Sequence, residues 1–379
     1  YYSMKIINLS SIANPISISV QNPSRSDYDR FIGLEHYDSG EPVITRFQGT
    51  ELLTTSAKAF KANDILIARR NVYLKRAGIV FFDGITSGDS IILRLKEDTQ
   101  KTIGYSREDL IRYIPFMLNS EHFWIYANKH ADGMNSKRIS KDTLLEYEFE
   151  LPSIDEMRDI SDKLWAAYRL KEAYKKLLVT TDEMVKSQFI EMYYNTHNKQ
   201  TLESVCPIMS KGITPKYVES SSVLVINQAC IHWDGQRLGN IKYHNEEIPV
   251  RKRILESGDV LLNATGNGTL GRCCVFICPS DNNTYINDGH VIALSTDRAV
   301  ILPEVLNTYL SLNDTQAEIY RQYVTGSTNQ VDIVFSDIKK MKVPVPSMDE
   351  QILFVEVLKQ ADKSKFGDFK SQFIEMFGN

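Results

Sequence analysis

The clearest pattern of apolar and polar positions is a helical repeat over residues 151–197. Apolar or small side chains recur at alternating spacings of three and four from position 160 to 192, and neither Pro nor Gly occurs between 153 and 195. Ser153 is followed three residues later by Glu156, the signature of a capping box at a helix start. The pattern predicts one amphipathic helix of about 40 residues, roughly 60 Å long. No small domain needs such a helix internally, so a spacer between two domains is expected.

A second helix with the same start signal is expected at residues 346–379. Ser347 and Glu350 repeat the capping box, and the phrase KSQFIEMYYN at 186–195 returns as KSQFIEMFGN at 370–379. From the capping-box Pro to the Phe of the phrase is 37 residues in the first copy and 27 in the second. The second helix is therefore expected to be about 15 Å shorter. Whether Gly367 breaks it stays open, since an interior Gly costs only about 1 kcal/mol.

The stretches before the helices read as two copies of one mixed unit. Short β-like runs occur at 65–68, 78–82 and 91–95, and residues 112–130 have helical spacing. The segment at 254–266 mirrors the one at 59–70, because each leads through a Gly-Asp or Asn-Asp turn into an apolar strand. We expect an α/β (α+β) fold with pseudo-two-fold organisation. Its parts are a globular domain at 1–150, a helix at 151–197, a second globular domain at 198–345 and a shorter helix at 346–379.

Composition favours an ordinary soluble protein. Charged residues make up 24% of the chain and hydrophobic residues 42%. No apolar run approaches the roughly 18 residues of a membrane span, and no signal peptide is evident, so we expect no membrane contact. Five cysteines are odd in number and lie mostly on apolar stretches. They favour reduced thiols in the cytoplasm over a disulfide framework.

Charge is distributed unevenly along a chain whose net charge is −4. A generic nucleic-acid coat would be basic overall. Between positions 58 and 76, however, six basic side chains accompany one acid, Asp64. This is the strongest electrostatic footprint for phosphates in the chain, although a solvated hairpin face is the plainer alternative. Its candidate DNA-binding residues are Arg69, Arg70, Asn71, Tyr73, Lys75 and Arg76.

The second copy has a Gly-rich segment in the corresponding place. Residues 266–271 match G-x-G-x-x-G, but a strand-like run follows them rather than the helix that a dinucleotide site needs. A hairpin tip that lets the backbone approach a partner is the better interpretation, with a purely structural hairpin as the alternative. The candidate DNA-binding residues here are Asn263, Thr265, Asn267, Thr269 and Arg272.

Weaker candidates follow the same logic, with solvated charges or satisfied loop amides as their alternatives. Polar segments precede each long helix, a basic run precedes the second Gly-Asp turn, and two amides follow a strand. These candidates are Asn135, Lys137, Arg138, Asn227, Gln228, Arg251, Lys252, Arg253, Asn329 and Gln330.

No motif indicates catalysis by this chain. A P-loop, G-x-S-x-G, H-E-x-x-H and a methyltransferase cofactor loop are all missing from the sequence. Cys230 with His232, and Cys274 with Cys278, lack the paired spacing of a zinc site. We therefore expect no catalytic residue, no metal ligand and no cofactor in this chain.

The order of parts resembles the specificity subunit of type I restriction–modification systems. The resemblance rests on the two P-S-x-D-E helix starts, the two KSQFIEM phrases and GNGTLGR after a GDVLL strand, and it covers essentially the whole chain. It implies two target recognition domains, each binding one half of a bipartite double-stranded DNA target. The domains would be separated by antiparallel coiled-coil-like helices that dock two modification subunits.

Those modification subunits would carry S-adenosylmethionine and methylate adenine. A motor-nuclease subunit would join for cleavage, with Mg and ATP also expected in partners, and self-association through the helices stays open. Candidate partner-binding positions on the helices are Ile160, Leu164, Tyr168, Tyr174, Leu178, Phe189, Met192, Phe373 and Met376. Two other classes remain: a methyltransferase or nuclease fragment acting alone on DNA, and a coiled-coil scaffold without a nucleic-acid role.

Overall fold

The computed structural model describes residues 5–134, 136–194, 196–327 and 330–377. The side chains of residue 194 and of residues beyond 362 lie outside the description. The chain forms two compact units, unit 1 (residues 1–172) and unit 2 (residues 173–379). The boundary falls inside α5 (Ile154–Phe189), because the first half of this helix packs on unit 1 and the second half on unit 2.

Unit 1 is built on two four-stranded sheets and a two-stranded ribbon, with every strand pair antiparallel except β4 and β8. The first sheet has the order β2 (Ala13–Ile16), β9 (Ser90–Leu95), β6 (Ile65–Ala68), β7 (Ala77–Ile79). The second has the order β3 (Ile18–Val20), β5 (Ala57–Phe60), β8 (Gly84–Thr86), β4 (Phe31–Ile32). The ribbon pairs β1 (Lys5–Asn8) with β10 (Glu148–Leu151).

The strand β6 shows why this unit is layered. All four of its residues are buried. Ile65 and Ile67 pack into the core that includes the helices, whereas Leu66 and Ala68 pack into a second core on the opposite face. Successive strand side chains point to opposite faces, so a continuous apolar run fits a strand covered on both sides. The helices are α1 (Thr99–Thr102), α2 (Arg107–Met117), α3 (Glu121–Lys129) and α4 (Lys141–Leu145).

The predicted helical segment at 112–130 is two helices rather than one. Between α2 and α3, the hydroxyl of Ser120 accepts a hydrogen bond from the backbone N–H of Phe123. This is an N-cap, which starts a new helix and lets the chain change direction. Apolar periodicity alone does not reveal such a break.

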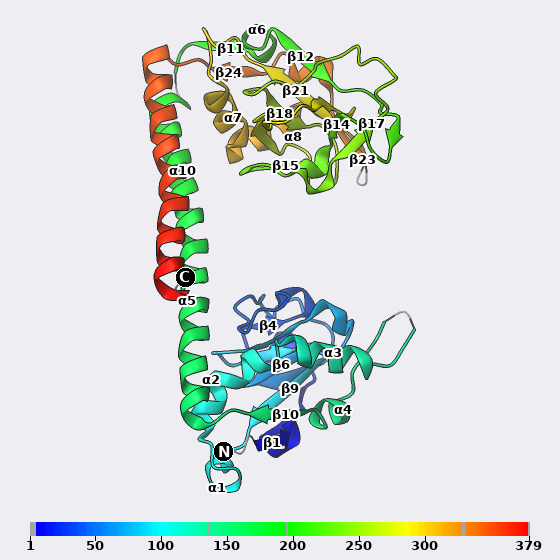
Figure 1. The fold of residues 1–379 in the computed structure, drawn as a ribbon, viewed down its shortest axis with the longest axis vertical. Helices are drawn as coiled ribbons and strands as arrows, with labels where there is room; N and C mark the ends of the chain where they lie inside the picture. The colour runs from blue at the N-terminus through cyan, green and yellow to red at the C-terminus, as the bar shows by residue number, and fades with distance from the viewer. Residues whose placement is uncertain (1–4, 135, 195, 328–329, 378–379) are drawn as a thin grey trace. The chain divides into compact units, whose positions relative to one another are not determined.

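Unit 2 is also built on two four-stranded sheets and a ribbon, and its first sheet has the same order of strands as that of unit 1, whereas the second sheets differ in strand order (Figure 1). One sheet has the order β12 (Ile208–Lys211), β21 (Val291–Ser295), β18 (Val260–Asn263), β19 (Cys273–Val275). The other has the order β13 (Tyr217–Val218), β17 (Lys242–His244), β14 (Val223–Ile226), β20 (Thr284–Asn287), with β14 and β20 parallel. A ribbon again pairs β11 (Lys199–Thr201) with β24 (Lys342–Pro344).

The remaining elements of unit 2 cover these sheets. Two further strand pairs are β15 (Ile231–His232) with β16 (Gly235–Gln236), and β22 (Val324–Ser327) with β23 (Gln330–Ile333). The short helices are α6 (Leu202–Val205), α7 (Pro303–Ser311), α8 (Asn313–Gln322) and α9 (Phe335–Ile338).

In unit 2, the second half of α5 and the first half of α10 (Met348–Phe377) lie side by side (Figure 1). Phe189 stacks edge-on against Phe354, and one turn further along α5 the Tyr193 hydroxyl donates to the carbonyl oxygen of Glu350. The later residue of α5, Tyr193, contacts the earlier residue of α10, Glu350, so the two helical segments run antiparallel. A π-helical turn at Ile190–Tyr194 extends α5.

Both helices start as the capping boxes predict. Glu156 Oε2 accepts from the backbone N–H of Ser153 at 3.0 Å and from its hydroxyl at 2.7 Å, and Glu350 with Ser347 repeats this at 2.9 and 2.7 Å. α10 spans 30 residues and α5 spans 36. The backbone of α10 continues through Gly367, which answers the question that the sequence left open.

Candidate nucleic-acid interface

In unit 1, the predicted basic loop after β6 lies beside the segment that precedes α4. The carbonyl oxygen of Arg69 accepts from the N–H of Ile139 at 3.0 Å, and the N–H of Asn71 donates to the carbonyl oxygen of Lys137 at 2.7 Å. Arg70 and Arg138 form an antiparallel bridge. The fold therefore brings together two basic segments that are more than 60 residues apart in the sequence.

Six basic residues meet on this surface, which we term the cationic cluster: Lys58, Arg69, Arg70, Lys137, Arg138 and Lys141. The amino group of Lys58 donates to the carbonyl oxygen of Ser90 at 2.7 Å. Burial lowers the pKa of Lys58, and the positive charges of Arg69 and Lys141 lower it further. Asp89 acts in the opposite direction on the pKa of Lys58. Asp89 also pairs with Arg70 at 3.3 Å, and it is the one acidic side chain paired with the cluster among the described residues. Like charges held close together favour binding of an anion. Among the described atoms, the buried Nε of Arg69 has no hydrogen-bond partner.

Lys58 belongs to the basic run of the sequence but was not among the predicted DNA-binding residues, and neither was Lys141. Lys141 lies in the first turn of α4, 65 residues beyond the end of the basic loop. In the sequence Lys141 follows the candidate Arg138 by three residues, which is the one local signal for it.

Other residues of the loop at 69–76 have structural partners. The guanidinium of Arg76 donates to the carbonyl oxygens of Leu34 and Arg70 at 3.1 and 2.9 Å, which gives this side chain a structural role, and its contact with DNA stays a prediction. Lys75 pairs with Glu121 at 2.8 Å. Asn71 has a left-handed backbone (φ 54°), and its side-chain oxygen accepts from the Ser136 hydroxyl. Tyr73 is exposed and stays a prediction.

In unit 2, the loop at 263–272 is held from inside by Asn263. This side chain is fully buried, and its amide donates to the carbonyl oxygens of Gln228 and Thr269 at 3.0 and 3.2 Å. A buried amide with both protons used cannot reach a base edge, so the prediction for Asn263 is wrong. Asn267 is exposed at the tip, and Arg272 is half-buried. The Thr269 hydroxyl donates to the carbonyl oxygen of Thr265.

The two amides after β14 have different roles. Asn227 caps the turn at 228–230, because its oxygen accepts from Ala229 N–H at 2.9 Å while its nitrogen donates to the carbonyl oxygen of Asn240 at 2.8 Å. It is the satisfied loop amide that the alternative interpretation describes. Gln228 is half-buried, and its Oε1 accepts from the hydroxyl of Thr265 at 3.1 Å.

The basic run at 251–253 separates into three roles. Arg253 makes a bidentate ion pair with the buried Asp259 at 3.1 and 3.0 Å, which gives it a structural role, and its contact with phosphate stays a prediction. Lys252 donates to the carbonyl oxygens of Lys211 and Gly212, whereas Arg251 is exposed. Gln330 is exposed on β23, and the predictions at Asn135 and Asn329 lie outside the described residues.

The predicted partner-binding positions on the helices differ in how exposed their side chains are. Ile160 and Leu164 are each 37% exposed and Met192 is 38% exposed, while Tyr168, Tyr174 and Leu178 are half-buried. Phe189 is fully buried in the core of unit 2, so its prediction as a partner contact is wrong. The side chains of Phe373 and Met376 lie beyond the described ones.

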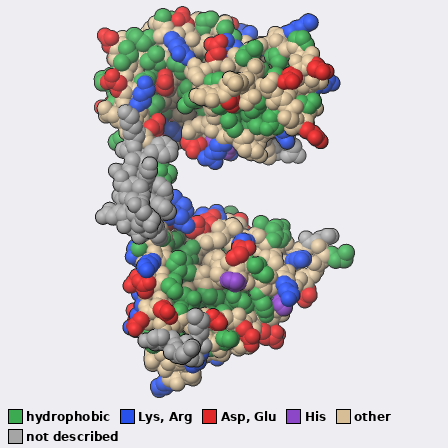
Figure 2. Space-filling view, viewed as in Figure 1, with side chains coloured by type: hydrophobic (Ala, Val, Ile, Leu, Met, Phe, Trp, Pro, Cys, Tyr) green, Lys and Arg blue, Asp and Glu red, His purple; other side chains and the backbone are tan. Residues whose placement is uncertain are grey.

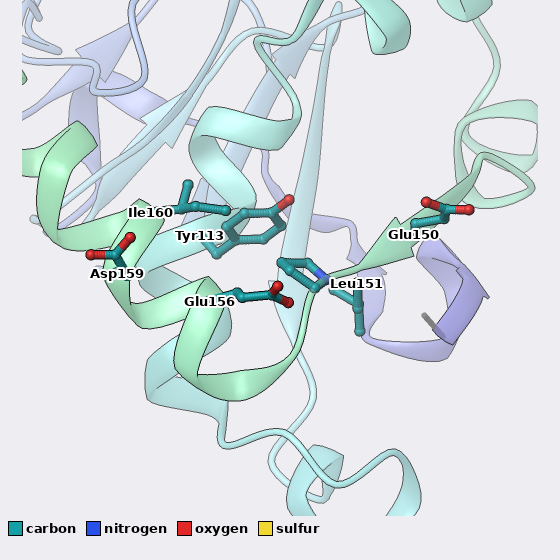
Figure 3. Close-up of a pocket in the computed structure, with 7 residues that line it drawn as sticks. Tyr113, Glu150, Leu151, Glu156, Asp159 and Ile160 are labelled. Atoms are coloured by element: carbon teal, nitrogen blue, oxygen red, sulfur yellow. The ribbon is translucent and has the colours of Figure 1, made fainter. Parts of the chain in front are cut away.

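A shallow cavity of about 330 Å³ lies at the start of α5 (Figure 3). Its lining includes Tyr113, Ile160 and three acids, Glu150, Glu156 and Asp159. The carboxylates do not converge, because Glu150 and Asp159 lie at opposite ends of the view and Glu156 is engaged by Ser153. Within the described ranges no group of three or more His, Cys, Asp or Glu is placed to hold a metal ion. The cavity therefore has the geometry of a helix-capping region.

Charge on the face shown in Figure 2 is mixed, with Lys and Arg interspersed among Asp and Glu over both units. This agrees with the small net charge, and it makes the cationic cluster a local feature. Of the helices that the structure describes, none is long and apolar enough to cross a membrane.

Comparison with known proteins gives matches in structure alone. No protein-family model and no curated protein sequence matches the chain. One chain from a study of complex assembly and conformational transition of the type I restriction–modification system matches with a TM-score of 0.52 at 16% identity, covering 99% of this chain and 94% of that one. The type I restriction–modification S subunit from M. genitalium matches with a TM-score of 0.53 at 13% identity, covering 99% and 93%. The chain therefore has the fold of the specificity subunits of type I restriction–modification systems.

Proposed function

We propose that this chain is the DNA-binding specificity subunit of a type I restriction–modification complex. The observation that carries the proposal is the match of both globular units and both long helices, over 99% of the chain, to subunits of such systems. The internal repeat supports it, since two similar units on one chain suit a target in two parts.

The chemistry of unit 1 supports duplex DNA as the ligand. The cationic cluster carries six basic residues, and among the described residues Asp89 is the acidic side chain paired with it, through Arg70. Each Lys or Arg that neutralises a phosphate releases condensed counterions, so such a surface gains affinity without reading sequence. Its exposed Lys137 and Arg138 and its half-buried Arg69 suit contact with a phosphate backbone.

In this proposal, partner subunits carry out the catalytic steps and this chain does not. The described residues offer no converging acid–base pair and no metal-ligating group, while the specificity subunit resemblance supplies partners that bind S-adenosylmethionine, ATP and Mg. The helices α5 and α10 are the proposed docking elements, with the exposed Ile160 and Leu164 as contacts for a modification subunit.

The test is to co-express the chain with the modification subunit of the same system and to sequence the methylated bases of the host DNA. We expect adenine methylation within one bipartite motif that contains a fixed gap. A purified chain that transfers methyl groups without partners would favour a stand-alone enzyme. A complex that forms but neither binds nor methylates any duplex would favour a scaffold.

A further inference from the structure

Three side chains of unit 2, from three separate segments of the sequence, form a hydrogen-bonded chain. The hydroxyl of Thr265 donates to Gln228 Oε1 at 3.1 Å and contacts His290 Nδ1 at 2.9 Å. Thr265 and Gln228 are among the residues predicted to bind DNA, whereas His290 is not. It is exposed in the turn between β20 and β21.

The protons of this chain can be assigned by counting donors. A threonine hydroxyl has one hydrogen, and here it is used toward Gln228. In the contact between Thr265 and His290, the donor is therefore Nδ1–H of the imidazole. The neutral ring then carries an acceptor lone pair on Nε2. On the other side of the chain, the Gln228 amide nitrogen donates to none of the described residues, so its two protons are available.

The backbone holds this chain in place from three segments. Ala264 N–H donates to the carbonyl oxygen of His290 at 2.8 Å, and His290 N–H donates to Asp288 Oδ1 at 2.9 Å. Gly266 has φ +104°, and a Cβ there would lie 2.1 Å from Thr269 Oγ1 and 2.7 Å from Gln228 Oε1. The glycine thus lets the loop approach Gln228 closely. A donor and an acceptor fixed by backbone contacts are preorganised for a partner.

A basic groove adjoins the chain. It is a cavity of about 510 Å³ whose lining includes the exposed Lys216, Arg251 and Lys252. Ile213, also in its lining, bridges to Asp288, two residues before His290. The polar chain and the groove are therefore neighbours on unit 2. Lysine and arginine position a nucleic-acid backbone, whereas fixed donors and acceptors distinguish bases.

We propose that the chain Gln228–Thr265–His290 is the base-reading element of unit 2, with the adjoining groove holding backbone phosphates. This rests on the proposed function. His290 Nε2 would accept from an exocyclic amino group, and the Gln228 amide would donate to a neighbouring acceptor. The major-groove edge of adenine presents such a pair, N6–H₂ beside N7, and a C·G pair presents C N4–H₂ beside G O6.

The test uses the complex reconstituted with modification subunits and compares His290→Phe, Thr265→Val and Arg251→Ala with the wild type. We expect His290→Phe to reduce the preference for the wild-type base at one position of one half-site by roughly 10- to 100-fold. The salt dependence of binding should not change. Thr265→Val keeps the side-chain shape but releases His290, so it should relax the same position. Circular dichroism and the Tm of each variant verify folding.

Arg251→Ala is the matched contrast within unit 2. It should weaken binding to all duplexes and lower the slope of log K against log salt by about 1, with the methylated motif retained. A motif that stays identical in His290→Phe and Thr265→Val, in complexes that still methylate DNA, would overturn this inference and leave the proposed function standing. A wild-type complex that binds no duplex would overturn both.

Discussion

Units 1 and 2 carry different side chains at a loop that occupies the same backbone position in both. In each unit the chain leaves the third strand of the first sheet, β6 or β18, and pairs with the segment that precedes the unit's last short helix. The pairing residues are Arg70 with Arg138 in unit 1 and Thr265 with Asp332 in unit 2. One position of the fold thus carries arginines in one copy and neutral and acidic groups in the other. The backbone decides where a contact surface lies, and side chains decide what it binds.

The units also share a buried carboxylate that they neutralise differently. Asp64 and Asp259 occupy equivalent turns, and each accepts from the N–H three residues before it. Arg94 of β9 pairs with Asp64, whereas Arg253 of the preceding loop pairs with Asp259. A buried charge requires a partner, and any nearby segment can supply it.

The largest expected effect is a difference in stability loss between substitutions in the two halves of α5. Phe189→Ala removes a fully buried ring from the core of unit 2 and should lower the free energy of unfolding by about 3–5 kcal/mol. Leu164→Ala, on the half that packs on unit 1, should cost less than about 1 kcal/mol because this side chain is already 37% exposed. Urea denaturation followed by hydrogen exchange of each unit measures both. Equal losses would show that the two halves are equally buried.

The second prediction tests whether the shared carboxylates act alike. Asp64→Asn and Asp259→Asn each remove the buried carboxylate that pairs with an arginine, Arg94 or Arg253, and should destabilise their own unit by roughly 3 kcal/mol. Arg253 keeps Glu256 at 3.3 Å as a second, exposed partner. Hydrogen exchange resolved by residue should place the loss in unit 1 for Asp64→Asn and in unit 2 for Asp259→Asn. A loss spread equally over both units would contradict the separation into two units.

The third prediction concerns the chemistry that distinguishes the units. Arg69→Ala in the assembled complex should weaken duplex binding about tenfold and reduce the salt slope by about 1, since one phosphate contact is lost. Fluorescence anisotropy at several salt concentrations measures this. Lys101→Ala, an exposed lysine on α1 outside the cationic cluster, is the matched control and should leave both quantities unchanged. If the two variants behave alike, the cluster is a solvated surface.

The smallest expected effect concerns the pKa values of the glutamates in the two capping boxes, which both copies share. Hydrogen bonds from the Ser153 hydroxyl and N–H lower the pKa of Glu156, and those from Ser347 lower the pKa of Glu350. Because the folded pKa lies below the unfolded value of about 4.3, the stabilisation is present above that pH and is lost as pH falls through the folded pKa. Carbon-detected NMR titration should show both carboxyls below their ordinary range. Ser153→Ala should raise only the Glu156 value.

Local rules predicted the parts of the fold that depend on neighbours in sequence. The helix starts at 153 and 347 follow from side chains that bond their own backbone three residues away. The strands at 65–68 and 91–95 follow from apolar runs. The break between α2 and α3 was missed, because Ser120 is compatible with either a helix interior or a cap until tertiary packing selects one.

The candidate site was less predictable, since it depends on which distant segments meet. Arg69 and Lys141 are both brought close to Lys58, and Thr265 is brought beside His290, by contacts between segments far apart in the sequence. Tertiary contacts also bury Asn263 and give Arg76 and Arg253 hydrogen-bond partners. In the sequence these three residues cannot be distinguished from polar neighbours that remain exposed.

Two copies of a sheet-and-helix unit can be recognised from the sequence alone, since repeated phrases and capping boxes are local patterns. Only the tertiary structure decided which polar side chains remain available to a ligand. That outcome depends on burial and on hydrogen-bond partners supplied from elsewhere in the chain, and neither is encoded in the spacing of residues along it.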